Sequence, residues 1–381
     1  MIKRIIQLLT LALLFPNGVA MAQTTVQDSM FWGGAQHRFR VYVPATVKCA
    51  LVVHLHGYGS SGYLEQLYTN YMPIADTAGF VVAYPEGLVD PLGNQSWNVG
   101  WALQVNNDDV GFLSAFIDTM VHRYLLDPSA VFVSGISNGG FMAHRLACEL
   151  SNKVAAIASV SGGMTPQLYA SCSPANPVPV LEIHGTADST IPYAGSVNPA
   201  SMNIDSVVKR NAQLIGANPN PQVNTLSHNP NTVNGTSVEH YVYSGGPNGA
   251  TSEFYKIIGG AHVDWPGFDN STNNDFSAAK EIWRFFRNYR SCTPLGLKET
   301  AAQQNIRVYP NPTNGIVNVD LKGSDEYTSY EIVDSRGRVV RSGELSNESK
   351  LRFDMNGLTY GAYVLVLRGR RGDLREKITL E

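Results

Sequence analysis

The arrangement best suited to chemistry is a serine held between two glycines, Gly135-Ile136-Ser137-Asn138-Gly139. A β-branched and aromatic run, 131–134, precedes it, and a stretch compatible with a helix follows it. This pattern between a strand and a helix is typical of a sharp, strained turn that lifts the serine hydroxyl above a sheet. The flanking glycines allow strand and helix to crowd together. We therefore predict that Ser137 is a nucleophile, although short patterns of this kind also occur by chance in loops rich in glycine and serine.

A serine hydroxyl is a weak nucleophile, so a histidine must accept its proton and a carboxylate must orient that histidine. Asp188 follows the apolar run 180–183, and His262 follows the run 255–258. Both therefore lie on loops where predicted strands end, and they follow the serine in the order aspartate, then histidine. Asp205 falls within a predicted helix, and Asp264 lies too near His262 in sequence. We predict a catalytic triad of Ser137, Asp188 and His262.

A developing oxyanion needs two preset N–H donors. The helix that follows Ser137 offers the backbone N–H of Asn138 at its positive end. The glycine-rich segment His56-Gly57-Tyr58-Gly59 follows the apolar strand 50–55. We predict that the backbone N–H of Tyr58 is the second donor and that His56 braces this loop.

A metal-dependent hydrolase is the alternative that His54-x-His56 raises. Against it, His122 and His144 fall within predicted helices, and the glycine-rich continuation suits an oxyanion loop better. The spacing of the cysteines does not resemble a zinc site. We therefore predict no metal and no cofactor.

Three tryptophans are candidates for stacking on a sugar or phenolic ring of a substrate: Trp97, Trp101 and Trp265. Trp265 is the strongest of them because it lies three residues from His262. For the other two, ordinary packing is equally expected. Asp108-Asp109 most simply caps the helix that follows it.

Apolar strands alternate with helices over most of the chain, which indicates an α/β fold with a mostly parallel sheet covered on both faces. Residues 24–44 indicate an edge hairpin, and 216–237 a loop rich in Asn, Pro and Thr. The other predicted strands cover 50–55, 80–84, 131–134, 154–160, 178–183, 238–243 and 253–258, and the predicted helices cover 108–124, 138–150, 201–215 and 275–290.

The chain has 381 residues, of which 44% are hydrophobic, so it can form one large core and a smaller domain. Its net charge of −3 gives no electrostatic footprint for nucleic acid. Residues 1–22 resemble a secretory signal peptide: Lys3-Arg4, a short apolar run, then Ala20-Met21-Ala22. No second apolar stretch is long enough to span a bilayer, so we expect an exported protein that starts at Gln23 and has no transmembrane segment.

Four cysteines occur, and an even number in an exported chain favours disulfides. Three pairings are possible. We favour Cys148–Cys172 and Cys49–Cys292, and four unpaired buried thiols are the alternative.

The character of the chain changes after residue 292. Lys, Arg, Asp and Glu make up 25 of the last 89 residues but only 34 of the first 292. Apolar residues there alternate with polar ones between turn signals, for example Val317, Val319 and Leu321, which indicates a small antiparallel β-sandwich. We predict a catalytic domain at 23–292, a linker at 293–305 and a β-sandwich at 306–381.

Five motifs over roughly 36–291 resemble the secreted feruloyl esterase and polyhydroxybutyrate depolymerase group, which is related to carbohydrate esterase family one. They are His54-Leu55-His56-Gly57, Asp108-Asp109-Val110-Gly111-Phe112, Gly135-Ile136-Ser137-Asn138-Gly139-Gly140, His184-Gly185-Thr186-Ala187-Asp188, and Gly260-Ala261-His262 followed by Trp265-Pro266-Gly267. The resemblance implies an α/β-hydrolase fold and a metal-free serine esterase that uses the triad above. The acyl group stays open because the same core serves feruloyl, acetyl and hydroxybutyrate esters.

The tail, 306–381, resembles the type A sorting domain of the type IX secretion system of Bacteroidetes. The motifs are 308–315 (VYPNPTNG), 334–337 (DSRG) and 358–363 (LTYGAY). The resemblance implies that the type IX machinery carries the protein across the outer membrane after periplasmic transit. The tail is then cleaved or attached to the surface.

The sequence thus predicts an exported serine carboxylesterase that acts on feruloyl, or else acetyl, esters of plant cell-wall polysaccharide. Depolymerisation of polyhydroxybutyrate or another polyester is the enzymatic alternative. A serine peptidase is disfavoured because nothing forms the large extra domain that such enzymes carry. A non-catalytic surface binding protein is the alternative from another class, and the complete set of triad residues argues against it.

Overall fold

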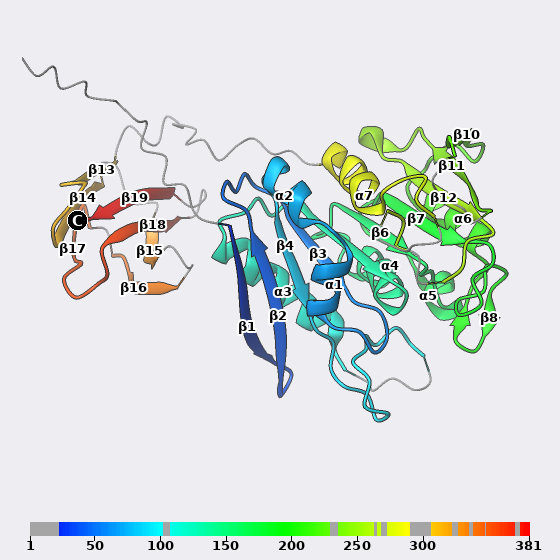
Figure 1. Ribbon diagram of the computed structural model, residues 1–381. Coiled ribbons are helices and arrows are strands. Elements are labelled where there is room, and N and C mark those ends of the chain that lie inside the picture. The colour runs from blue at the N-terminus through cyan, green and yellow to red at the C-terminus, as the bar shows by residue number, and fades with distance from the viewer. Residues whose placement is uncertain are drawn as a thin grey trace, which may run out of the picture.

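The computed structural model describes residues 23–101, 107–228, 235–262, 265–267, 273–289, 306–321, 327–334, 338–346, 348–369 and 374–381. The predicted signal peptide (1–22) and linker (293–305) lie outside these ranges, so both stay predictions. Figure 1 shows the order of the elements along the chain.

A ten-stranded sheet organises the larger part of the molecule. Its strands are β1 (Thr24–Trp32), β2 (Ala35–Val43), β3 (Leu51–Leu55), β4 (Val81–Pro85), β5 (Val131–Ile136), β6 (Ala156–Val160), β7 (Val180–Gly185), β10 (Gln222–Thr225), β11 (Ser237–Tyr243) and β12 (Ser252–Ile258). Their order across the sheet is β1-β2-β4-β3-β5-β6-β7-β12-β11-β10. Neighbours from β4 to β12 pair in parallel, and the two strands at each edge pair antiparallel.

Helices lie against both faces of this sheet (Figure 1). They are α1 (Gly62–Tyr68), α2 (Met72–Ala78), α3 (Asp109–Arg123), α4 (Asn138–Glu149), α5 (Pro166–Ser171), α6 (Ile204–Leu214) and α7 (Ala278–Phe286), with short 3₁₀ turns η1 (Pro247–Gly249) and η2 (Arg287–Tyr289). One core holds apolar residues of α3 and α4, and a second holds those of α2 and α7. Every residue of β3, β4, β5, β6 and β7 is buried, as parallel strands covered on both faces require.

Helix α3 begins where the sequence predicts it. The side chain of Asp108 accepts a hydrogen bond from the backbone N–H of Gly111 at 2.9 Å, so Asp108 is the N-cap. Asp109 instead turns inward and accepts from the N–H of Asn98 at 2.6 Å. Only the first of the two aspartates therefore has the predicted capping role.

Several short elements are absent from the sequence-based prediction. Helix α1 exposes Leu64 and Leu67 and buries Glu65 and Gln66, the reverse of the expected pattern, because the buried polar groups bind partners inside the protein. Strand β10 interrupts the predicted loop 216–237; all four of its residues are exposed, so no apolar alternation marks it. Further elements of the larger domain that the sequence does not predict are α2, α5, η1 and the two-residue strands β8 (Ser196–Val197) and β9 (Ala200–Ser201).

The C-terminal unit consists of two antiparallel sheets. Their strands are β13 (Ile306–Tyr309), β14 (Ile316–Leu321), β15 (Tyr327–Asp334), β16 (Val339–Glu344), β17 (Lys350–Asp354), β18 (Gly361–Gly369) and β19 (Leu374–Leu380). The sheet orders are β13-β14-β17 and β16-β15-β18-β19. The predicted alternation holds, since Val317, Val319 and Leu321 all face the shared core. The predicted fold class, an α/β sheet followed by a small antiparallel sandwich, is confirmed. Strands β13 and β16 were not predicted, because few of their side chains are buried.

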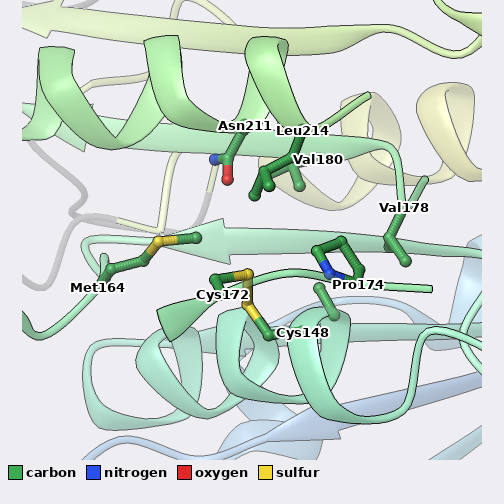
Figure 2. Close-up of a pocket in the computed structure, with 9 residues that line it drawn as sticks. Cys148, Met164, Cys172, Pro174, Val178, Val180, Asn211 and Leu214 are labelled. Carbon is green, nitrogen blue, oxygen red and sulfur yellow. A yellow bond between two sulfur atoms is a disulfide. The ribbon is translucent and has the colours of Figure 1, made fainter. Parts of the chain in front are cut away.

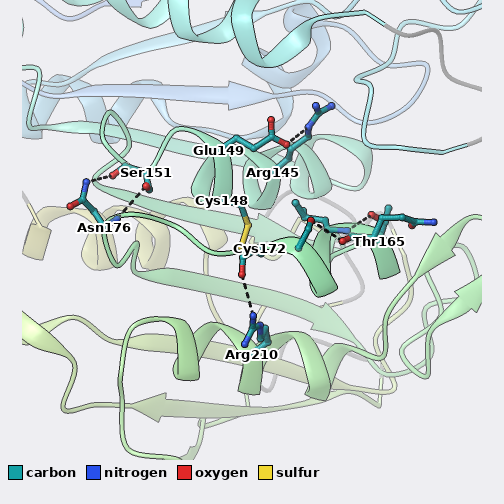
Figure 3. Close-up of a disulfide and its surroundings, with 11 residues drawn as sticks. Arg145, Cys148, Glu149, Ser151, Thr165, Cys172, Asn176 and Arg210 are labelled. Carbon is teal, nitrogen blue, oxygen red and sulfur yellow. Dashed lines mark hydrogen bonds and ion pairs between the residues drawn. A yellow bond between two sulfur atoms is a disulfide. The ribbon is translucent and has the colours of Figure 1, made fainter.

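The predicted Cys148–Cys172 disulfide is present, with the two Cα atoms 5.3 Å apart. It joins the last turn of α4 to the end of α5 and lines a small, mostly apolar hollow against Leu214 of α6 (Figure 2). Arg210 of α6 donates to the carbonyl oxygen of Cys172 at 3.1 Å (Figure 3). The disulfide therefore ties together the layer of helices behind Ser137. The other predicted pairing involves Cys292, which lies outside the described residues.

Removing this disulfide should destabilise the larger domain. In Cys148→Ala/Cys172→Ala, the unfolded chain gains the freedom of a segment with a sequence separation of 24, which on the chain-entropy estimate lowers stability by about 3 kcal/mol. Scanning calorimetry should show a lower Tm for the unfolding of the larger domain. Ser173→Ala, at an exposed neighbouring position, is the control and should leave the Tm unchanged. An unaltered Tm in the double variant would contradict this account.

Candidate active site

Ser137 lies in a strained turn between β5 and α4. Its backbone has φ 53° and ψ −119°, a conformation that residues with a side chain rarely adopt. A Cβ atom on Gly135 would lie 2.3 Å from the carbonyl oxygen of Gly139, and one on Gly139 would lie 2.1 Å from that of Leu55. Both positions therefore require glycine, and the serine side chain is presented at the carboxyl end of β5.

The loops that carry Asp188 and His262 are held together by hydrogen bonds. They follow β7 and β12, which are adjacent parallel strands. The N–H of Ala187 donates to Gly260 at 2.8 Å, and the N–H of Gly259 donates to the hydroxyl of Thr186 at 2.8 Å. A Cβ on Gly185 would lie 2.2 Å from the oxygen of Gly260, so close approach of the two loops depends on that glycine.

The three predicted triad residues come together in one line of hydrogen bonds. Nδ1 of His262 lies 2.7 Å from Oδ2 of Asp188, and Nε2 of His262 lies 3.1 Å from Oγ of Ser137. Because a carboxylate only accepts, the proton of neutral His262 lies on Nδ1 and Nε2 is free to accept the serine proton. This arrangement can transfer the hydroxyl proton of Ser137 to His262.

Asp188 is fixed by backbone groups as well. Its Oδ1 accepts from the N–H groups of Thr190 at 2.9 Å and Ile191 at 2.8 Å. Burial opposes ionisation of this carboxyl, but hydrogen bonds from His184 and His262 outweigh burial and hold its pKa well below the usual range. Asp188 is therefore an ionised partner for His262.

The two predicted oxyanion donors are backbone groups beside Ser137. The backbone N–H groups of Asn138 and Tyr58 donate to no other group within the described parts of the chain. A Cβ on Gly57 would lie 3.5 Å from Cβ of Ser137, so the loop that carries Tyr58 passes directly beside the serine. An oxyanion site requires two such donors, and the segments that carry them both adjoin Ser137. Their catalytic use stays a prediction.

His56 braces this loop. Its Nδ1 donates to the carbonyl oxygen of Gly57 at 2.7 Å, and its Nε2 accepts from the N–H of Gly87 at 2.9 Å. Accepting at Nε2 requires the neutral ring, and burial lowers the pKa of His56 accordingly. His54 is engaged at both nitrogens too: Nδ1 lies 2.9 Å from Oγ of Ser134, and Nε2 lies 3.1 Å from Glu65.

Trp97 and Trp265 do not have the predicted role in substrate stacking. Trp97 is 0% exposed and donates from Nε1 to the carbonyl oxygen of His56, while Trp265 is 1% exposed and donates to that of Thr69. Neither ring has a face open to a substrate, because both fill the interior and brace the loops around the site. Trp101 is half-buried, packs against Phe141 and donates to Ala200 at 3.1 Å, so its contact with substrate stays a prediction.

Two contacts near the site are not predictable from the sequence. The side chain of Asn138 accepts from the N–H of Trp97 at 2.7 Å and donates to its carbonyl oxygen at 3.1 Å. The ring of His184 reaches Oδ2 of Asp188, with Nε2 3.3 Å away. Both residues belong to the motifs that carry the resemblance, but the pattern alone does not reveal what their side chains touch.

The parallel sheet, the helices on both faces and the strained serine turn define an α/β-hydrolase. Among solved structures, the acetyl xylan esterase from Aspergillus awamori superposes with a TM-score of 0.51, over 70% of this chain and 99% of that one, at 17% sequence identity. That likeness supports the fold alone.

Two separate segments of the chain match known families. Residues 36–216 match the phospholipase/carboxylesterase family, and residues 307–381 match the secretion system C-terminal sorting domain. The first segment is thus similar to that hydrolase family, and the second is similar to a sorting domain of secreted proteins. None of the helices in the described ranges is long and apolar enough to cross a membrane.

Curated relatives match parts of the hydrolase segment. The bifunctional acetylxylan esterase/xylanase XynS20E of Neocallimastix patriciarum is 31% identical over 44% of this chain and 24% of its own length. Feruloyl esterase B of Piromyces equi is 28% identical over 50% of this chain and 35% of its own length. Putative esterase NocK of Nocardia uniformis subsp. tsuyamanensis is 34% identical over 46% and 52%, respectively. The chain therefore spans about a quarter to a half of the length of these relatives.

Replacing Asn138 should destabilise the protein. In Asn138→Ala, the N–H and carbonyl oxygen of Trp97 lose their buried partner, which should lower the free energy of unfolding by roughly 2 kcal/mol. Urea unfolding followed by tryptophan fluorescence measures this. Asn176→Ala, at an exposed asparagine whose amide bonds Ser151, is the matched control and should change the midpoint little. Equal midpoints for the two variants would refute a structural role for the Asn138 side chain.

Proposed function

We propose that the protein is a serine carboxylesterase in which Ser137 is the nucleophile, His262 the general base and Asp188 the group that orients His262. One observation carries this proposal: the imidazole of His262 bridges the hydroxyl of Ser137 and the carboxylate of Asp188 at hydrogen-bond distances. The matches to esterases support the same reaction class.

The reaction follows from this geometry in two halves. Oγ of Ser137 attacks the ester carbonyl carbon while its proton moves to Nε2 of His262, and the carbonyl oxygen becomes an oxyanion between the N–H groups of Asn138 and Tyr58. The tetrahedral intermediate collapses as His262 returns the proton to the leaving alkoxide, which departs as an alcohol. An acyl-serine remains.

Water then repeats the sequence. His262 accepts a proton as the water oxygen attacks the acyl carbon, and the same two N–H groups hold the second oxyanion. Collapse transfers that proton back to Ser137 and releases the acid. Asp188 stays ionised throughout and stabilises the imidazolium form of His262. Every proton in this scheme is carried by a group of the chain or by water.

We propose feruloyl or acetyl esters of plant cell-wall polysaccharide as substrates. The support is the activities in the names of the relatives, acetylxylan esterase and feruloyl esterase. Trp101 is the remaining aromatic candidate for a substrate contact, since this residue is half-buried and not fully enclosed. A polyester is the alternative substrate.

Wild type and Ser137→Ala should be assayed on p-nitrophenyl acetate, methyl ferulate and hydroxybutyrate oligomers. Wild type should hydrolyse the first two, and kcat in Ser137→Ala should fall at least about a thousand-fold because the nucleophile is gone. A serine-directed phosphonylating reagent should label wild type once and Ser137→Ala not at all. Ser173→Ala, at an exposed serine outside β5, is a control that keeps Ser137 and should keep wild-type activity.

Other results of these assays would favour one of the alternative functions. Preference for hydroxybutyrate oligomers would make the protein a polyester depolymerase. Inhibition by a chelator without phosphonylation would favour the metal-dependent alternative. Full activity of Ser137→Ala would overturn the mechanism, and an inactive wild type would favour the binding protein.

We also propose that residues 306–381 deliver the enzyme to the type IX secretion machinery, and thereby to the exterior or the cell surface. The match of 307–381 to a sorting domain supports this. The boundaries at 292 and 306 remain part of the proposal.

Deletion of 306–381 should retain the enzyme in the periplasm of a bacterium with a type IX system. The expected result is that antibody detects the truncated chain in the periplasmic fraction and the full chain outside the cell. Full-length Ser137→Ala is the control and should be exported normally, because catalysis is not needed for sorting. Export of the truncated chain would contradict the assignment of the tail.

A further inference from the structure

A chain of buried ionisable side chains extends from Asp188 into the interior of the domain. Behind it, three further groups continue into the interior: His184 and Glu182 of β7 and His144 of α4, each 0% exposed. Nε2 of His184 lies 3.3 Å from Oδ2 of Asp188, and Nδ1 of His184 lies 3.7 Å from Oε1 of Glu182. Oε2 of Glu182 lies 2.9 Å from Nε2 of His144. Residues 182 and 184 lie on the same face because side chains alternate along a strand.

The contacts of His184 define where its protons lie. Nε2 lies 3.0 Å from the carbonyl oxygen of Ile191 as well as near Asp188, and both partners only accept, so Nε2 carries a proton. Nδ1 has no hydrogen-bond partner among the described residues and faces Glu182. A lone pair there would repel the carboxylate in a buried site, whereas a proton there gives the ring a positive charge between two anions.

Charge balance favours the same form. Burial disfavours a charged His184, but Asp188 and Glu182 outweigh burial and raise its pKa to about 9. Glu182 is buried too, but the hydrogen bond from His144 and the nearby ring of His184 outweigh burial and keep its pKa below the usual range. Ser159 donates a further hydrogen bond to Glu182 at 3.2 Å. Without a cation, two buried carboxylates would face each other across one ring.

We propose that His184, supported by Glu182, is a positioning residue: a buried cation that holds Asp188 against His262 and moderates the negative charge that His262 experiences. This inference rests on the proposed esterase mechanism and assigns a role to groups that the mechanism does not use. In this proposal, the protonation of His262 depends on His184, which contacts the triad through Asp188.

The other charged residues near His184 do not compensate the negative charge of Asp188 and Glu182. The ring of Tyr193 packs edge-on against His184, with centroids 6.1 Å apart, and its hydroxyl donates to Asp205 at 2.6 Å. Lys256, which pairs with His184 in the register of β7 and β12, lies over the Tyr193 ring and 4.0 Å from Asp205. Asp205 and Lys256 thus offset each other on the far side of Tyr193.

The test is the pH profile of kcat/KM for p-nitrophenyl acetate in His184→Gln. Glutamine keeps an N–H donor for Asp188 but carries no charge. The acid limb of the profile should move to higher pH by about half a unit or more, because the cation that opposes protonation of His262 is removed. His240→Gln is the matched control: His240 also pairs with a glutamate, Glu253 at 2.8 Å, and stacks on Tyr255 away from the triad. That variant should keep the wild-type acid limb.

A second measurement separates charge balance from packing. His184→Gln leaves Asp188 and Glu182 as uncompensated buried anions, so its Tm should fall by about 5 °C or more. Adding Glu182→Gln should recover part of this loss, because one of the two anions is then neutral. If His184 only packs, the double variant should be no more stable than the single one.

Two results would overturn the inference: an acid limb in His184→Gln that coincides with wild type, or a double variant with a Tm no higher than that of His184→Gln. Failure of the esterase mechanism is distinguishable, since Ser137→Ala would then retain wild-type activity. The comparison of Tm values would still report whether His184 carries a charge.

Discussion

The structure of the site depends on the close approach of three backbone segments at Ser137. The end of β3, the end of β5 and the start of α4 meet where a single Cβ atom on Gly135 or Gly139 would overlap a carbonyl oxygen. This crowding keeps Ser137 at φ 53° and directs its hydroxyl toward the loops after β7 and β12. The strain at one residue is maintained because the fully buried parallel strands around it cannot shift independently.

Several ionisable side chains are buried in the interior beneath the site. On one side, His54 joins Ser134 to Glu65, and Glu65 accepts from Ser60 at 2.9 Å, so this pair anchors the loop beside Ser137. On the other side, Glu182 and His184 lie behind Asp188. Apolar residues in these places would pack well, but they would not fix the direction of a loop. Buried pairs of ionisable side chains make directional contacts, and these restrict each loop to one arrangement.

Sequence patterns predict the features that depend on chain order and burial. The apolar runs indicated the central strands, and the positions of Asp188 and His262 at strand ends were sufficient to select them as partners of Ser137. The cap at Asp108 and the Cys148–Cys172 disulfide were also predictable.

Features that depend on which way a side chain points were not predictable. Trp97 and Trp265 are of a residue type that can stack on a substrate ring. Both are nevertheless buried, and their indole N–H groups donate to backbone carbonyl oxygens of neighbouring segments. Helix α1 places its leucines outward because Glu65 and Gln66 find partners inside. The same limit applies to His184, whose ring position follows from the alternation of β7 and from the turn at Ile191.

The Cys148–Cys172 bond also has a consequence for the order of maturation. Thiols remain reduced in a bacterial cytoplasm and oxidise after the inner membrane has been crossed. Helix α4, whose first residue follows Ser137, is therefore clamped to α5 only in the oxidising compartment. A chain that has not yet met oxidising conditions therefore lacks this covalent link between α4 and α5. Recombinant protein from a reducing host would lack this clamp unless it were reoxidised.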